Sequence, residues 1–164
     1  MRFSMEQQFT APLTAVEGAF TDPALLAELA TRPELGRPEL LQHIADGDRV
    51  LQQVRYAFVG ELSPAVTAVV DPRRLTWVEH TELDCRTHRS VYRIQPDHYP
   101  DRLSCSGTVM LEPAPSGGTR RVVRGDLRVH FPLIGGKVER AIVSGLRAHA
   151  SAEARVVQAW LDRR

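Results

Sequence analysis

Residues 123–131 read VRGDLRVHF, and this stretch decides the fold because a strict alternation ends within it. Apolar residues at odd positions alternate with polar residues at even positions. The apolar set is Val123, Leu127, Val129 and Phe131, and the polar set is Arg124, Asp126, Arg128 and His130. This period of two is typical of a strand with one dry face and one solvated face. Beyond Phe131 the period changes to three and four, which predicts one helix over residues 136–161.

The same period of two extends backwards from Phe131 to about residue 38 and indicates an antiparallel meander. The turn sequence Asp46-Gly47-Asp48 separates two alternating runs, as expected at a hairpin. Residues 2–9 form a further alternating run, with Phe3, Met5 and Phe9 on one face. Two short helices should follow this first strand, the second one capped by Asp22.

The predicted C-terminal helix carries one mainly apolar stripe: Val138, Ile142, Leu146, His149, Glu153, Val156 and Trp160. A helix of this length spans nearly 40 Å at about 1.5 Å per residue. It is long enough to cover the dry face of the sheet. We therefore predict an α+β fold in which residues 1–164 form a single domain.

Composition limits the classes of function. The chain has 164 residues and 21 basic against 20 acidic side chains, a net charge of +1, so charge does not favour nucleic acid or an anionic membrane as a partner. No run reaches the roughly 18 apolar residues of a membrane span, and a cytoplasmic location is expected. Cys85 and His88 lack a second ligand pair, so we expect no metal site, and we expect no cofactor.

Several stretches carry a resemblance to a known family. They are Phe9-Thr10-Ala11-Pro12, Phe20-Thr21-Asp22-Pro23, Ser106-Gly107-Thr108, the run from Phe131 to Glu139, and the run from Glu153 to Leu161. With the order of elements, they resemble the helix-grip fold of START, Bet v 1 and polyketide-cyclase-like proteins, and within it the bacterial family of unknown function DUF2505. The resemblance implies a curved antiparallel sheet wrapped around the long C-terminal helix, with an apolar cavity between them. It implies no reaction.

The inward-facing side chains are the expected ligand-binding residues. They are Tyr56, Phe58, Trp77, Glu79, Tyr92, Phe131, Ile142, Leu146 and His149. One helix cannot fill a strongly curved sheet along its whole length, so these residues should line a concave pocket for a small molecule. The alternative is that they close into an ordinary core.

Three features have competing interpretations. His149 and Glu153 lie four apart and are the candidate catalytic pair, or a buried pair that satisfies itself. Glu79 either polarises a ligand or pairs with an arginine at the sheet edge. Leu62 to Val70 has helical spacing and forms either a lid over the pocket or a plug of core.

Two functions follow from this sequence. The favoured one is non-catalytic binding or carriage of a hydrophobic small molecule, lipid or polyketide-like. The alternative is a cyclase- or dehydratase-type enzyme that acts on a bound carbonyl compound through His149 and Glu153. The sequence points to no particular protein partner, and stable membrane insertion is not expected.

Overall fold

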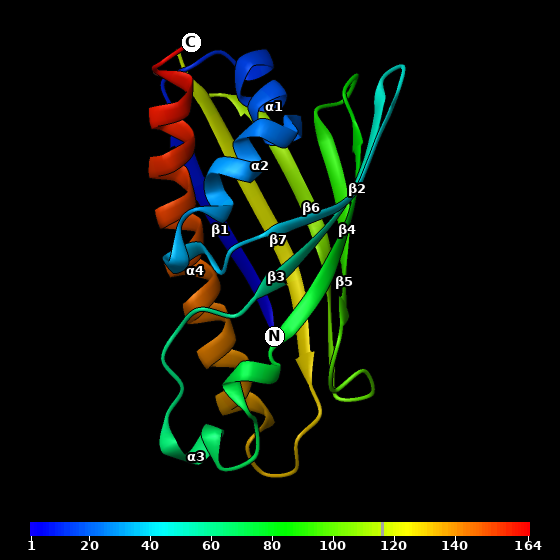
Figure 1. Ribbon diagram of the computed structural model, residues 1–164, viewed down its shortest axis with the longest axis vertical. Helices are drawn as coiled ribbons and strands as arrows, with labels where there is room; N and C mark the ends of the chain where they lie inside the picture. The colour runs from blue at the N-terminus through cyan, green and yellow to red at the C-terminus, as the bar shows by residue number, and fades with distance from the viewer. Residues whose placement is uncertain (116) are drawn as a thin grey trace.

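The computed structural model describes residues 1–115 and 117–164 and contains one antiparallel sheet of seven strands (Figure 1). The strand order is β1-β7-β6-β5-β4-β3-β2. Strands β2 to β7 therefore pair with their neighbours in the sequence, and β1 pairs with β7. The strands are β1 (Arg2–Phe9), β2 (Glu39–Asp46), β3 (Arg49–Ala57), β4 (Thr76–Asp84), β5 (Arg89–Pro96), β6 (Leu103–Pro113) and β7 (Thr119–Val129). The predicted meander is confirmed.

Helix α4 (Gly135–Leu161) runs along the concave side of the sheet, and α1 (Leu13–Thr21) and α2 (Pro23–Ala30) lie beside its C-terminal half (Figure 1). Asp22 caps α2 as predicted: its carboxylate accepts a hydrogen bond of 2.8 Å from the backbone N–H of Ala24. Shorter elements are α3 (Pro64–Thr67), η1 (Pro33–Leu35) and η2 (Pro72–Arg74). The α+β helix-grip arrangement is therefore confirmed, and no helix among residues 1–115 and 117–164 is long and apolar enough to cross a membrane.

The register between β3 and β4 brings the polar and aromatic side chains of the concave face together. Gln52 lies opposite Thr81, Val54 opposite Glu79, and Tyr56 opposite Trp77. Alternate residues of a strand share a face, so these six side chains form three neighbouring rows facing the helices.

The buried stripe of α4 differs from the prediction near its end. Val157 is fully buried, whereas Val156, the predicted member, is half-buried. The period of 3.6 residues makes a stripe drift around the helix, and α1, which packs on this half of α4, selects Val157.

Gly145 lets Phe58 pack directly against α4. A Cβ atom at position 145 would lie 2.5 Å from the ring of Phe58, a distance that two carbon atoms do not approach. The absence of a side chain here therefore fixes where the aromatic ring sits beside the helix.

The segment predicted as a lid or plug contributes to the core. It contains α3, and Val66 and Val70 are both buried in the cluster that also holds Ile142 and Leu127. Helix α3 lies at the lower end of the molecule in Figure 1, and the burial of the two valines supports the plug.

Candidate functional site

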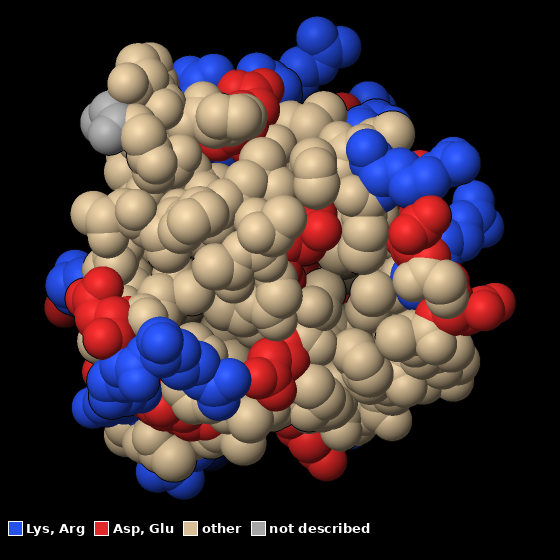
Figure 2. Space-filling view, turned by 90° about the horizontal axis from the view of Figure 1, so that it is seen from above, with Lys and Arg blue, Asp and Glu red and all other residues tan. Residues whose placement is uncertain are grey.

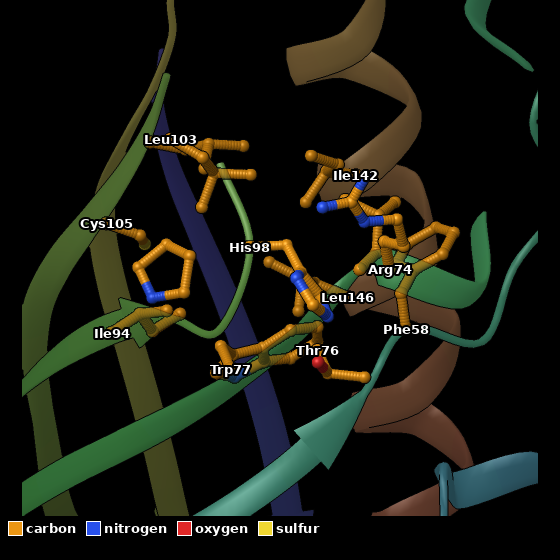
Figure 3. A pocket seen from close by; sticks show the side chains of 13 residues that line it. Phe58, Arg74, Thr76, Trp77, Ile94, His98, Leu103, Cys105, Ile142 and Leu146 are labelled. Atoms are coloured by element: carbon orange, nitrogen blue, oxygen red, sulfur yellow. The ribbon is translucent and has the colours of Figure 1, made fainter. Parts of the chain in front are cut away.

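The interior between sheet and helices contains two pockets rather than one cavity. The first is almost purely apolar and has about 450 Å³ of empty space, solvent at its mouth included. Its walls come from β4, β5, β6, β7, α4 and the loop that follows β3. Figure 3 shows side chains converging on it: Phe58, Trp77, Ile94, Leu103, Ile142 and Leu146. We call it the apolar pocket.

Trp77 lines the apolar pocket and carries a buried polar group. Its indole Nε1 is buried and has no hydrogen-bond partner among the residues described. A buried donor without a partner is costly, about 1–3 kcal/mol. A ligand that brings an acceptor such as a carbonyl oxygen would remove this cost.

Cys105 also lies on this wall, and burial raises the pKa of its thiol to about 12. The thiol therefore stays protonated at neutral pH. Because the thiolate is the nucleophilic form, Cys105 acts here as a small apolar side chain.

The second pocket lies under α1 and α2 and has about 880 Å³ of empty space, solvent at its mouth included. Its walls mix apolar residues with ionisable ones: Glu17, Glu79, His88, Arg121 and Glu153. We call it the polar pocket. Figure 2 shows the molecule from this end, hollowed near its middle, with Asp and Glu side chains beside the hollow and most Lys and Arg side chains around the outline.

A buried network ties three elements together at the floor of the polar pocket. The Arg121 guanidinium on β7 lies 3.5 Å from the carboxylate of Glu153 on α4 and donates to the side-chain oxygen of Gln7 on β1. The Gln7 amide in turn donates to Glu153 at 3.1 Å and to the backbone carbonyl of Ala150 at 2.6 Å. Arg121 also lies over the ring of Phe20, 4.3 Å from its centroid. The charges of Arg121 and Glu153 thus compensate each other.

Glu79 lies deep in the same pocket without such compensation. Its one hydrogen bond comes from the Thr81 hydroxyl at 3.2 Å, and no ion pair to it is formed within residues 1–115 and 117–164. The expected pairing with an arginine is therefore wrong, because Arg121 is drawn to Glu153. Burial raises the pKa of the Glu79 carboxyl, and the charge of Arg121 only partly opposes this.

Tyr56 is the neighbour of Glu79 on the wall of the polar pocket. Burial raises the pKa of its hydroxyl well above the ordinary value, and the charges of Glu79 and Glu153 add to this. The hydroxyl makes no hydrogen bond to any described residue, and both Tyr56 and Glu79 keep accessible surface. Since both side chains point inwards, that surface faces the pocket.

Glu17 and His88 form a further pair at the edge of the polar pocket. The His88 Nδ1 lies 2.9 Å from a carboxylate oxygen of Glu17 and joins α1 to the turn between β4 and β5. His88 adopts a left-handed backbone conformation, with φ of 53°. The pair holds α1 over the sheet.

The structure distributes the predicted ligand-binding residues over two pockets and the core. Phe58, Trp77, Ile142 and Leu146 line the apolar pocket, and Tyr56 and Glu79 line the polar pocket. The other three, Tyr92, Phe131 and His149, line neither.

Each of these three residues has a different neighbour that explains its place. The Tyr92 ring lies over Gly107 and Gly125, where added Cβ atoms would come within 2.7 and 2.4 Å of its hydroxyl. Phe131 lies beyond the end of β7 and packs on Tyr99, with ring centroids 5.9 Å apart. His149 packs edge-to-face with Tyr56, with ring centroids 6.0 Å apart.

The expected contact between His149 and Glu153 is not formed. Glu153 is occupied by Gln7 and Arg121, whereas His149 contacts Tyr56. Two residues four apart on a helix are offset by 40° around its axis, so their side chains can have different partners. Here Gln7 on β1 and Arg121 on β7 determine the orientation of Glu153.

Four residues of the polar pocket and its floor were not predicted as site residues: Gln7, Arg121, Glu17 and His88. The alternation along the strands could have indicated two of them. Gln7 lies on the same face of its strand as Phe3 and Phe9, and Arg121 on the same face as Val123. A polar residue in phase with a dry face must find a partner inside. Glu17 and His88 meet only through the tertiary fold.

The family comparison identifies the chain. The family described as "Protein of unknown function (DUF2505)" matches residues 4–161. The chain belongs to this family. No curated protein matches it.

Solved structures similar to this DUF2505 protein share its fold over the whole chain. One is the ZhuI aromatase/cyclase from Streptomyces sp. R1128, with a TM-score of 0.69 and 15% identity, covering 100% of this chain and 94% of the other. Another is norcoclaurine synthase from Thalictrum flavum, with a TM-score of 0.62 and 19% identity, covering 96% and 86%. The protein TTHA0849 from Thermus thermophilus has a TM-score of 0.62 and 20% identity, covering 97% and 98%. At these identities the likeness establishes the START/Bet v 1-like fold alone.

Proposed function

We propose that this protein binds or carries a hydrophobic small molecule, lipid or polyketide-like, in the apolar pocket between the sheet and α4. The observation that carries the proposal is the pocket wall, which combines Phe58, Trp77 and Ile142 with one unpartnered donor, the Trp77 indole N–H. An apolar concavity with few polar groups is the usual form of a small-molecule site. The ligand class this favours is a flat or branched apolar compound with a carbonyl or ether oxygen.

Non-catalytic binding fits the apolar pocket better than a reaction does. Its ionisable wall residues besides Cys105 are Arg74, from η2, and His98, from the loop between β5 and β6. The alternative, cyclase- or dehydratase-type chemistry through His149 and Glu153, requires both groups to reach one ligand. Their side chains have separate partners, so the geometry gives this alternative no support.

Binding of Nile red, a neutral dye whose emission rises in apolar surroundings, tests the proposal. The protein should bind the dye with a Kd of about 1 µM, which corresponds to about −8 kcal/mol. Replacing Ile142 by Trp fills the pocket and should weaken binding by at least about tenfold. Ser144→Trp adds the same side chain on the exposed face of α4 and should leave binding unchanged.

Two further observations keep this test decisive. Thermal unfolding shows whether Ile142→Trp still folds, and Leu146→Trp, at a half-buried position on the same wall, provides a second blocked variant. Native mass spectrometry of the purified protein should show a bound apolar compound in the wild type and none in the blocked variants. If both variants fold and bind Nile red as tightly as the wild type, the apolar pocket is not the binding site.

A further inference from the structure

One carboxyl group of the polar pocket has no cationic partner among the residues described. Of its three carboxyl groups, Glu153 is paired with Arg121 and Glu17 with His88. The third, Glu79, has only the neutral Thr81 hydroxyl as a partner. A buried carboxylate without a cation is unfavourable, so Glu79 is the group in this pocket that would be stabilised by a cationic ligand.

Two acceptor groups at this point are free to receive hydrogen bonds from a ligand. The Thr81 hydroxyl occupies one carboxylate oxygen of Glu79, and no hydrogen bond from a described residue reaches the other. The Tyr56 hydroxyl oxygen is also without a partner within the described chain and lies on the same wall. Two free acceptors on one wall, one of them a carboxyl group without a cationic partner, match an ammonium group, which offers three donors and a charge.

The remaining walls of the polar pocket determine the chemical character of the rest of the ligand. Phe20, Leu25, Leu26 and Leu29 approach from α1 and α2, and Val54, Leu83, Val109 and Leu111 from the sheet. These side chains surround the acidic centre with apolar surface. A ligand that fills the pocket must therefore join a cationic end to an apolar body.

We propose that the polar pocket is a second binding site, for an amphipathic molecule with a protonated amine, and that Glu79 is its counter-ion. The site is separate from the apolar pocket, because none of the lining residues is shared. Acidic side chains around the hollow in Figure 2 favour the approach of a cation over that of an anion. The raised pKa of Glu79 in the free protein fits a carboxyl that awaits a cation.

Three ligands that differ only at one end test the charge requirement. They are 4-phenylbutylamine, 4-phenylbutan-1-ol and 4-phenylbutanoate, measured by isothermal titration calorimetry at about pH 8, where an alkylamine is protonated. A hydrogen bond to a charged group is worth about 1.5–3 kcal/mol. The amine should therefore bind at least about tenfold more tightly than the alcohol, and the carboxylate should not bind measurably.

Two variants on β4 distinguish the effect of the Glu79 charge from the effect of removing any acidic side chain of that strand. Glu79→Gln keeps the shape and removes the charge, and it should lower the affinity for the amine to that for the alcohol. Glu82→Gln removes an acidic group from the exposed face of the same strand and should change neither. Tyr56→Phe removes the second acceptor and should weaken amine binding by about two- to tenfold, so it provides an independent test should Glu79→Gln fail to fold.

The outcomes distinguish this site from the apolar pocket. Ile142→Trp should abolish Nile red binding and leave amine binding intact. Equal affinity for amine and alcohol in the wild type, no binding of any of the three ligands, or an amine preference that survives in a folded Glu79→Gln variant would each overturn the proposal. Loss of amine binding in Ile142→Trp would show that the two pockets are one site.

Discussion

Tyr56 and Trp77 lie directly opposite each other on β3 and β4, with ring centroids 6.1 Å apart and ring planes inclined by 24°. Tyr56 lines the polar pocket and Trp77 the apolar one. The stacked pair therefore marks the boundary between the two pockets. Each ring also carries a polar group without a partner among the described residues, the phenol hydroxyl of Tyr56 and the buried indole N–H of Trp77.

The Trp77 indole N–H should select ligands with an acceptor. We expect 2-acetylnaphthalene to bind more tightly than 2-ethylnaphthalene by about two- to tenfold, the worth of one neutral hydrogen bond. Trp77→Phe should abolish this preference, because phenylalanine has no donor. Competition against Nile red measures both affinities, and equal affinities in the wild type would contradict an acceptor role for the ligand.

Gly145 and Gly18 should respond in opposite directions to the same change. Gly145→Ala places a Cβ against the Phe58 ring and should destabilise the protein by about 1–3 kcal/mol. Gly18→Ala, inside α1 with nothing within 4 Å of the added atom, should stabilise it by about 0.5–1 kcal/mol. Urea unfolding measures both. A stabilised Gly145→Ala variant would show that Phe58 can move away from α4.

The fold could be predicted because its signals are local. The alternation ending at Phe131 and the stripe beginning at Val138 belong to single elements, and the Asp22 cap spans two residues. The end of the stripe was misplaced. Whether Val156 or Val157 is buried depends on α1, a partner more than a hundred residues away, and no local period contains that contact.

The site was less predictable because its decisive contacts are long-range. The alternation of side chains along each strand predicted that Tyr56, Glu79 and Trp77 lie on the inner face. It could not predict which pocket each of them lines. The polar pocket is completed by Arg121 and Glu153, which come from β7 and α4 and are held together by Gln7 of β1. Tyr92 has inward parity as well, yet the Gly107–Gly125 pair lets it lie against the sheet, a detail of register.

His149 should contribute to stability and not to ligand binding in the apolar pocket. Its ring edge meets the Tyr56 ring, and such a pair is worth about 0.5–1.5 kcal/mol. His149→Ala should lose about that much unfolding free energy while Nile red affinity stays within about twofold. A tenfold weaker affinity in a folded variant would instead place His149 on the ligand.

Glu79 should make the stability of the free protein fall as the pH rises. Burial raises the pKa of its carboxyl above the ordinary value of 4.5, with Arg121 opposing and Glu153 adding to the shift. The remaining charged groups of the pocket, Glu17 and His88, pair with each other. Below the ordinary pKa the carboxyl is protonated in both states. Between that value and the raised pKa the unfolded chain releases its proton first, so unfolding becomes easier.

Glu79→Gln should remove this part of the pH dependence, because the amide stays neutral. The variant should therefore gain stability relative to the wild type as the pH rises from about 4 to about 8. Urea midpoints at a series of pH values measure the difference, and Glu82→Gln, exposed on the other face of β4, should show a far smaller trend. If the wild type instead gained stability relative to Glu79→Gln with rising pH, Arg121 would be compensating Glu79 in the free protein, and Glu79 would not lack a cationic partner.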